Sequence, residues 1–219
     1  MTTKIKTVVL DLETVPNLAM VALLPPVEAK GTLKDPEKIA ADIEEKQLKQ
    51  LEDMALSPFT NLICCACFCD ADTDEVTSFM LDPTTLDEKP LLENIWEHLH
   101  QYDRFCTFNG NAFDIPVLRF HSMVNRVQPS VNISTAKYRI DNHIDVRAIL
   151  GDYQQFAKGN LDWYCRIILS ADNGKTDGIN GATVQHLWDC GCYAEIQEYC
   201  ENDVRILAQL YRRMEGYYF

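Results

Sequence analysis

Basic residues are scarce in this sequence of 219 residues, because 20 Lys and Arg stand against 33 Asp and Glu, for a formal net charge of −13. Proteins that coat nucleic acid non-specifically neutralise its phosphates with Lys and Arg. The composition therefore argues against a general nucleic-acid-coating protein. It leaves open an enzyme that acts at a metal site, since such a site itself contributes several carboxylates.

Long apolar runs are also absent. The longest one, residues 62–69, is far shorter than the roughly 20 residues that a membrane-spanning helix needs. No basic start is followed by an apolar stretch, so we expect no classical secretion signal. With 47% hydrophobic and 24% charged residues, the composition is typical of one soluble α/β domain. We expect a cytoplasmic protein without a membrane partner, forming a single domain over residues 1–219.

The sequence shows no sign of disulfide pairing. It has nine cysteines, an odd number, and four of them lie in one apolar run, namely Cys64, Cys65, Cys67 and Cys69. An odd count without other signs of an oxidising compartment indicates reduced thiols in a core. A zinc site made by Cys67, Cys69, Cys190 and Cys192 is the less favoured alternative, since the Cys-x-Cys spacing is tighter than in common zinc motifs.

The most strand-like stretch of the N-terminal part, residues 7–14, contains two acids. Asp11 and Glu13 are two residues apart, so their side chains point to the same face of a strand. Desolvation and like charge both disfavour such a pair unless a cation or a catalytic task compensates. A divalent metal is the simplest explanation. The alternative is that the strand ends by Asp11 and both acids are solvated.

The remaining chain alternates between helical and strand-like patterns. A helical excursion is predicted over about residues 35–56, with Asp35-Pro36 as its cap and first helical residue. A loop is expected over 173–181. Strands are predicted at 61–70, 75–81, 104–108 and 144–146, and helices at 90–100, from 114, at 161–169, 182–189 and 194–214. This order predicts a mixed sheet with helices on both faces, of the α/β class.

Two further acids lie at informative positions. Asp114 follows the turn signal Asn109-Gly110 and falls at or near a helix N-cap, which is its simple structural explanation. Asp203 lies in the apolar stripe of the last helix, with Tyr199 one turn before it on the same face. A buried acid there needs either a metal or a salt bridge to an Arg. Asp145 and Asp162 are simpler to explain as strand-end or helix-cap residues.

The distribution of charge reverses locally. Residues 115–150 contain five basic side chains against two acidic ones, whereas the whole chain is acidic. Such a segment is a candidate track for phosphates. We expect its basic residues to contact a nucleic-acid substrate, in particular Arg119, Arg126, Lys137 and Arg139.

Three short motifs follow one another along the chain, namely Asp11-x-Glu13, Asn109-Gly-x-x-Phe113-Asp114 and Tyr199-x-x-x-Asp203. In this order they resemble the three exonuclease motifs of the DEDD superfamily. Segments 12–14, 55–58 and 199–204 further resemble stand-alone 3'-5' exonucleases related to the proofreading domain of family B DNA polymerases. The sister subfamily has a histidine five residues before the last acid, where this chain has Glu198. Tyr199 therefore places the chain in the tyrosine branch.

This resemblance implies a ribonuclease H-like fold with a mixed five-stranded sheet and the four acids at one end of it. It also implies two divalent metal ions, Mg²⁺ or Mn²⁺. Asp11, Glu13 and Asp203 would hold one of them, while Asp11 bridges to the second, which Asp114 supports. Tyr199 would hydrogen-bond and orient a water, since its ordinary pKa of about 10 makes it a poor general base.

The activity implied is 3'-5' hydrolysis of phosphodiester bonds with release of nucleoside 5'-monophosphates. The partner expected is single-stranded DNA, at its 3' ends, in DNA repair or replication. Thr14, Asn109 and Phe113 belong to the motifs and are expected to contact the substrate. Two alternatives stay open, namely an RNA-processing 3'-5' exoribonuclease and a catalytically silent nucleic-acid-binding module.

Overall fold

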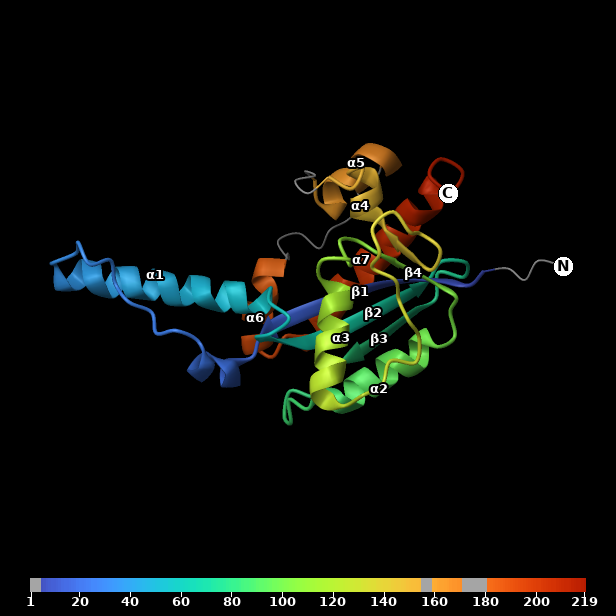
Figure 1. Ribbon diagram of the computed structural model, residues 1–219. Helices are drawn as coiled ribbons and strands as arrows, with labels where there is room; N and C mark the ends of the chain where they lie inside the picture. Colours follow the sequence, from blue (N-terminus) through green and yellow to red (C-terminus); the bar gives the residue numbers. More distant parts are fainter. Residues whose placement is uncertain (1–4, 155–158, 171–180) are drawn as a thin grey trace.

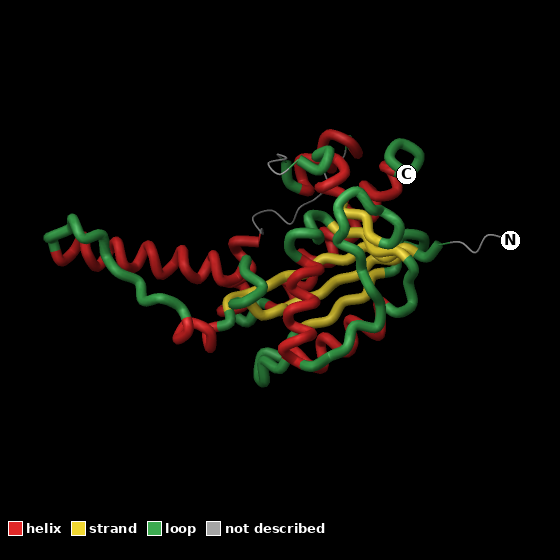
Figure 2. The backbone as a smooth tube through the Cα atoms, viewed as in Figure 1, coloured by secondary structure: helices red, strands yellow, loops and turns green. Residues whose placement is uncertain are grey.

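The computed structural model describes residues 5–154, 159–170 and 181–219. A five-stranded sheet in the order β3-β2-β1-β4-β5 forms its centre (Figures 1 and 2). β1 pairs antiparallel with β2 and parallel with β4; β2 pairs antiparallel with β3, and β4 parallel with β5. The predicted mixed sheet is confirmed. Its strands are β1 (Thr7–Pro16), β2 (Asn61–Asp70), β3 (Val76–Met80), β4 (Arg104–Thr107) and β5 (His143–Asp145).

The helices fall close to the predicted segments. They are α1 (Pro36–Ala55), α2 (Glu88–Leu99), α3 (Asp114–Asn125), α4 (Val146–Leu150), α5 (Leu161–Leu169), α6 (Gly181–Asp189) and α7 (Tyr193–Met214), with a 3₁₀ helix η1 (Leu18–Leu23). The patterns did not indicate η1 or α4. The strand expected at 144–146 ends at Asp145, because that residue caps α4, accepting a hydrogen bond from Ala148 N. Most of the loop expected at 173–181 lies outside the described residues.

Helices cover both faces of the sheet. On one face, Cys200 of α7 places its Sγ 3.9 Å from Oδ2 of Asp11 on β1. On the other face, the ring of Phe68 on β2 packs against His98 of α2, with ring centroids 4.8 Å apart. α3 lies beside α2 on this second face, in front of the sheet in Figure 1, whereas α7 lies behind it. The acids of β1 therefore point toward α7.

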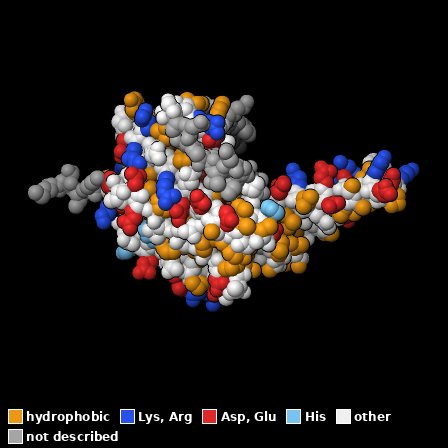
Figure 3. All heavy atoms as spheres, turned by 180° about the vertical axis from the view of Figure 1, so that it is seen from behind, with side chains coloured by type: hydrophobic (Ala, Val, Ile, Leu, Met, Phe, Trp, Pro, Cys, Tyr) orange, Lys and Arg blue, Asp and Glu red, His pale blue; other side chains and the backbone are white. Residues whose placement is uncertain are grey.

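The helix α1 projects from the body of the molecule (Figure 1). Asp35 caps it by accepting from Glu37 N, and a proline follows at the first position, as predicted. Lys46 and Asp42 form an i,i+4 ion pair with an N–O distance of 2.8 Å. Of the apolar stripe only Met54, at the C-terminal end, is buried. Figure 3 accordingly shows a projecting arm that carries acidic and basic side chains.

The C-terminal end of α1 is tied to the sheet. The last carbonyl groups of a helix have no partner inside it. Here Thr14 Oγ1 of β1 donates to Ala55 O at 2.7 Å, and Asn61 Nδ2 of β2 donates to the same oxygen at 3.1 Å. Thr60 Oγ1 donates to Met54 O at 3.1 Å. The arm is therefore anchored beside the strand end that carries Glu13.

Across the described ranges, no helix combines the length and the apolar character that are needed to cross a bilayer.

Candidate active site

The two acids of β1 lie side by side on the face that α7 covers. A carboxylate oxygen of Asp11, one of Glu13 and Cys200 Sγ all lie within 4.8 Å of one another. Glu13 is 9% exposed; Asp11 as a whole residue is half-buried, but protein atoms surround its carboxyl group closely enough to desolvate it. The alternative of a strand that ends by Asp11 is wrong, because β1 continues to Pro16. The register with β2 shifts between Glu13 and Thr14, which indicates a bulge directly after the second acid.

Asp114 reaches the same strand from α3. It is the first residue of this helix and is 2% exposed. Its Oδ1 accepts a hydrogen bond from Leu12 N, between the two acids of β1, at 3.2 Å. The N-cap residue is Phe113, which makes no side-chain capping bond. Asp114 is therefore directed at the acid pair instead of capping its helix from the N-cap position.

The third contribution comes from α7. Asp203 and Tyr199 lie on the buried side of this helix, where they are 8% and 6% exposed. Burial, Asp203, Glu13 and Asp11 all raise the pKa of the Tyr199 hydroxyl above its ordinary value. The phenol is therefore neutral at physiological pH, so it can donate a hydrogen bond but cannot act as an effective base.

Three of the acids act electrostatically on the fourth, Asp11. The pKa of Asp11 is raised well above its ordinary range by burial first and then by Asp114, Glu13 and Asp203. Burial also raises the pKa of Asp114 to about 7, with Asp145 adding to the effect. Carboxylates gathered in this way are unfavourable unless cations neutralise them. An all-oxygen set of this kind suits a hard divalent cation such as Mg²⁺ or Mn²⁺, so these residues fit the expected metal.

The loop between β4 and α3 has a tightly specified conformation. Asn109 adopts a left-handed backbone with φ of 71°, which Asn tolerates better than most residues. A Cβ on Gly110 would lie 2.2 Å from Thr107 Oγ1, so no larger residue fits there. Thr107 Oγ1 accepts from Gly110 N at 3.2 Å and is also hydrogen-bonded to His143 Nε2 at 2.9 Å. These contacts fix the path of the chain that leads to Asp114.

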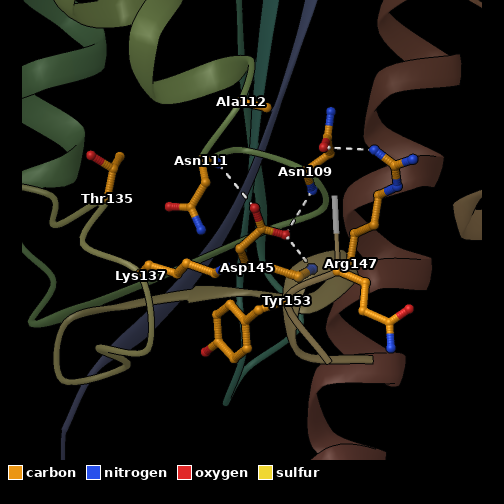
Figure 4. A pocket seen from close by; sticks show the side chains of 10 residues that line it. Asn109, Asn111, Ala112, Thr135, Lys137, Asp145, Arg147 and Tyr153 are labelled. Atoms are coloured by element: carbon orange, nitrogen blue, oxygen red, sulfur yellow. Dashed lines mark hydrogen bonds between the residues drawn. The ribbon is translucent and has the colours of Figure 1, made fainter. Parts of the chain in front are cut away.

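Asp145 holds this loop in place, a role that the sequence did not reveal. Besides capping α4, its carboxylate accepts from Asn109 N and from Asn111 N, both at 3.0 Å (Figure 4). Arg147 Nη1 donates to Asn109 Oδ1 at 2.8 Å. The sequence alone predicted Asp145 as a strand-end or cap residue. It could not indicate the contacts with Asn109 and Asn111, because these residues are 36 and 34 positions away.

A cavity of about 320 Å³ opens beside this loop. Basic and hydroxyl side chains line it, among them Lys137, Arg147, Thr135 and Tyr153 (Figure 4). Asn111 also lines it, and the Oδ1 atom of this residue is buried without a hydrogen-bond partner among the described residues. Lys137 and Arg147 therefore place positive charge at the cavity, while Asp145 also lies at its wall.

The other predicted substrate residues lie at several places. Among the basic residues of 115–150 that were assigned to substrate, only Lys137 lines the cavity; Arg126 and Arg139 are exposed elsewhere. The Arg119 guanidinium donates from Nη1 to Thr135 Oγ1 and from Nη2 to Ile133 O, so both of its terminal nitrogens already make a hydrogen bond within the protein. Phe113 is half-buried at the start of α3, and the hydroxyl of Thr14 anchors α1. Their roles toward substrate stay predictions.

The cysteines of the described residues are free thiols, and seven of the nine are buried, in agreement with the expectation of reduced core thiols. The set considered for zinc does not come together, because Cys190 is exposed after α6, whereas Cys67 groups with Cys65 and Cys200. No pattern in the sequence indicated that Cys200 lies with the β2 thiols.

Sheet order, helices on both faces and acids converging from β1, α3 and α7 define the class of the molecule. It is an α/β fold of the ribonuclease H-like kind found in polymerase exonuclease domains. A family B DNA polymerase from the hyperthermophilic archaeon Pyrobaculum calidifontis has a similar structure, with a TM-score of 0.67 over 97% of this chain at 13% identity. The chain spans about a quarter of that polymerase, 25% of its length. At this identity the likeness shows the fold alone.

The family model described as "predicted 3'-5' exonuclease related to the exonuclease domain of PolB" matches residues 53–217. This is more than half of the chain, so the protein belongs to that family. The matched segment includes Asp114, Tyr199 and Asp203, while Asp11 and Glu13 precede it. No curated protein matches the chain.

Proposed function

We propose that this chain is a metal-dependent 3'-5' exonuclease, a single catalytic domain that removes nucleotides one at a time from the 3' end of nucleic acid. The observation that carries the proposal is the convergence of four carboxylates, because Asp114, Glu13 and Asp203 all raise the pKa of Asp11. Membership in a family of predicted 3'-5' exonucleases supports the same conclusion. Single-stranded DNA is the proposed substrate, and nucleoside 5'-monophosphates are the proposed products.

In this proposal the acids hold two divalent ions, Mg²⁺ or Mn²⁺. Asp11, Glu13 and Asp203 are the ligands of one site, and Asp11 with Asp114 those of the other. Bound there, such ions would lower the pKa of a water and stabilise charge on the attacking and leaving oxygens. The acids contribute by their placement on rigid elements, since β1, α3 and α7 fix each carboxylate before substrate binds.

Tyr199 is proposed to position the attacking water. Its hydroxyl stays protonated because burial and the acids raise its pKa. A neutral phenol can donate a hydrogen bond and accept another, so it can orient a water without removing its proton. This role agrees with its place one turn before Asp203 on α7.

The substrate strand is proposed to pass beside the loop of residues 109–113. Lys137 and Arg147 bring positive charge to the cavity there. These two side chains would bind phosphate oxygens of the strand. Asn109 and Phe113 shape the loop, and Thr14, Arg119, Arg126 and Arg139 are proposed as further contacts along the strand.

The decisive experiment uses DNA and RNA oligomers labelled at the 5' or the 3' end, single-stranded and duplex, incubated with the protein and Mg²⁺ or Mn²⁺. The proposal expects mononucleotides from the 3' end and stepwise shortening of 5'-labelled single-stranded DNA. Preference for RNA would redirect the assignment to an exoribonuclease. Binding without any product would indicate a silent module, and internal cleavage would contradict the proposal.

A further inference from the structure

Three buried cysteines lie together beside the acid cluster, between the sheet and α7. Cys65 and Cys67 are on β2, and Cys200 is on α7; none of them has exposed surface. Their Sγ atoms all lie within 4.8 Å of one another. Cys65 Sγ and Cys67 Sγ are 3.6 Å apart. We call these residues the thiol triad.

One distance within the triad matches the separation of sulfur ligands around a single metal ion, and the third sulfur lies within 4.8 Å of both others. Zinc binds thiolate sulfur at about 2.3 Å, so two sulfurs at corners of a tetrahedron are about 3.8 Å apart. The observed 3.6 Å between Cys65 and Cys67 is close to this edge. The two strand residues point to the same face, and the helix brings the third sulfur against them. Rigid elements therefore present all three donors before any ion is bound.

A carboxylate lies next to Cys200, one member of the triad. Cys200 Sγ is 3.9 Å from Asp11 Oδ2 and 3.6 Å from Asp11 O. Cys200 thus belongs both to the thiol triad and to the group that it forms with Asp11 and Glu13. Three sulfurs and one carboxylate oxygen are a donor set that suits four-coordinate zinc.

We propose that Cys65, Cys67 and Cys200 form a binding site for a thiophilic divalent cation of the zinc class, with Asp11 as the adjacent oxygen ligand. Soft thiolates select zinc and cadmium, whereas Mg²⁺ and Mn²⁺ prefer the oxygen ligands of the acid cluster. The two sites therefore select different ions although they share Asp11. Binding forms three metal–sulfur bonds, and the three thiol protons are released to solvent.

One consequence rests on the proposed function. An ion in the thiol triad draws on the carboxylate of Asp11, which the proposed Mg²⁺ or Mn²⁺ site needs as well. Occupancy of the triad is therefore expected to slow the nuclease. The site itself is tested without nucleic acid, so its failure and the failure of the proposed function are distinguishable.

The test uses the full chain with Cys190→Ala, because Cys190 is exposed and its Sγ lies 3.8 Å from His186 Nε2, a surface pair that could bind metal. The protein is incubated with Cd²⁺ in excess Mg²⁺, long enough for local opening to admit the ion. Sulfur-to-cadmium charge-transfer absorption and cadmium content are then measured. We expect one equivalent of cadmium with a strong absorption band. Zinc content after purification without chelators gives a second readout.

Two matched variants separate the triad from other thiols. Cys67→Ala removes one triad sulfur and is expected to weaken cadmium binding at least about tenfold. Cys69→Ala removes a buried sulfur from the same strand but outside the triad, so it should bind as the parent does. Cys65→Ser serves as a second triad variant if Cys67→Ala does not fold. No band in the parent, or equal bands in triad and control variants, would overturn the site.

Discussion

At Asp11, three other carboxylates act on one side chain. Its pKa is raised by burial and then by Asp114, Glu13 and Asp203, so the site is electrostatically unfavourable without cations. A thiol is also close to this carboxylate, because Cys200 Sγ lies 3.9 Å from Asp11 Oδ2. A single residue thus connects the proposed hard-ion site with the thiol triad.

Asp114 gives a prediction for the protein without metal. Its folded-state pKa is about 7, above the value of about 4 for an unfolded chain. A raised carboxylate pKa means that stability is lost as pH rises from about 4 through 7. In chelator the free energy of unfolding should therefore fall between pH 5 and 8. Asp114→Asn, whose amide Oδ1 can still accept from Leu12 N, should be the more stable by on the order of a few kcal/mol at pH 8.

Urea unfolding of both proteins in chelator at pH 5, 6.5 and 8 measures this effect. Excess Mg²⁺ is the control. It should raise the free energy of unfolding of the native protein at pH 8, and raise that of Asp114→Asn by a smaller amount. A native protein whose stability in chelator does not fall with pH would show that Asp114 carries no such penalty.

Tyr199 gives a prediction for the rate. Tyr199→Phe keeps the packed ring and removes the hydroxyl that is proposed to orient water. We expect turnover to fall roughly ten- to a thousandfold, with metal and substrate binding largely kept. Single-turnover rates on a short single-stranded oligomer at saturating Mg²⁺ measure the change. A variant as fast as the native protein would mean that Tyr199 only fills the core.

At the scale of elements, a buried hydrogen-bond network joins β2, α2 and α3 on the face opposite the acids. Glu88 Oε1 accepts from Ile63 N at 2.8 Å, and Glu88 Oε2 lies 2.7 Å from His121 Nδ1. The other ring nitrogen of His121 lies 2.9 Å from Asn61 Oδ1, and Asn61 in turn holds the end of α1. This network supports the sheet from behind the site.

Glu88→Ala would leave the Ile63 amide and one ring nitrogen of His121 buried without their partner. We expect a loss of about 3 kcal/mol in the free energy of unfolding, from the desolvation of both groups. Denaturant unfolding measures it. Glu93→Ala on the exposed side of the same helix is the control and should cost less than about 0.5 kcal/mol. Equal effects of the two variants would contradict the structural role of the network.

Local signals were sufficient for most elements. Asp35-Pro36 gave the start of α1, and the apolar periodicity of α7 gave its length, since both depend on neighbouring residues only. The projection of α1 was not predictable, because an amphipathic stripe does not state how much of it will be covered. α4 was not predicted because the apolar residues on both sides of Asp145 fit a strand. In the structure the strand ends at Asp145, which is the N-cap residue of α4.

At the scale of the whole molecule, the positive charge near the proposed substrate path is limited. Lys137 is the one of the four predicted basic contacts that lines the cavity, while Nη1 and Nη2 of Arg119 each donate a hydrogen bond within the protein. Lys137→Gln should therefore weaken oligomer binding and lower the slope of log affinity against log salt by about 1. Turnover of bound substrate should change little.

Fluorescence anisotropy with a labelled oligomer in Ca²⁺, at several salt concentrations, measures this effect. Lys38→Gln on the projecting helix α1 is the matched control and should leave the slope unchanged. Arg119→Gln should change the slope less than Lys137→Gln does. An unchanged slope for Lys137→Gln would mean that this lysine only balances nearby acids.

The motif order and spacing singled out the four acids and the tyrosine, and the structure places them on β1, α3 and α7; their catalytic roles stay predictions. The sequence did not reveal how the site is assembled. Asp145 fixes the loop through amide groups 34 and 36 residues away, and Cys200 meets β2 thiols that are more than a hundred residues distant. Such contacts depend on strand register and helix packing, for which no local pattern exists.

The most direct test of the proposed nuclease compares the native protein with Asp11→Asn on 5'-labelled single-stranded DNA in Mg²⁺. Native protein should shorten the oligomer from its 3' end in steps of one nucleotide. Asp11→Asn should keep its circular dichroism spectrum and lose at least about a thousandfold in rate, because Asp11 is proposed to serve both metals. A folded Asp11→Asn protein that degrades the oligomer at nearly the native rate would contradict the account.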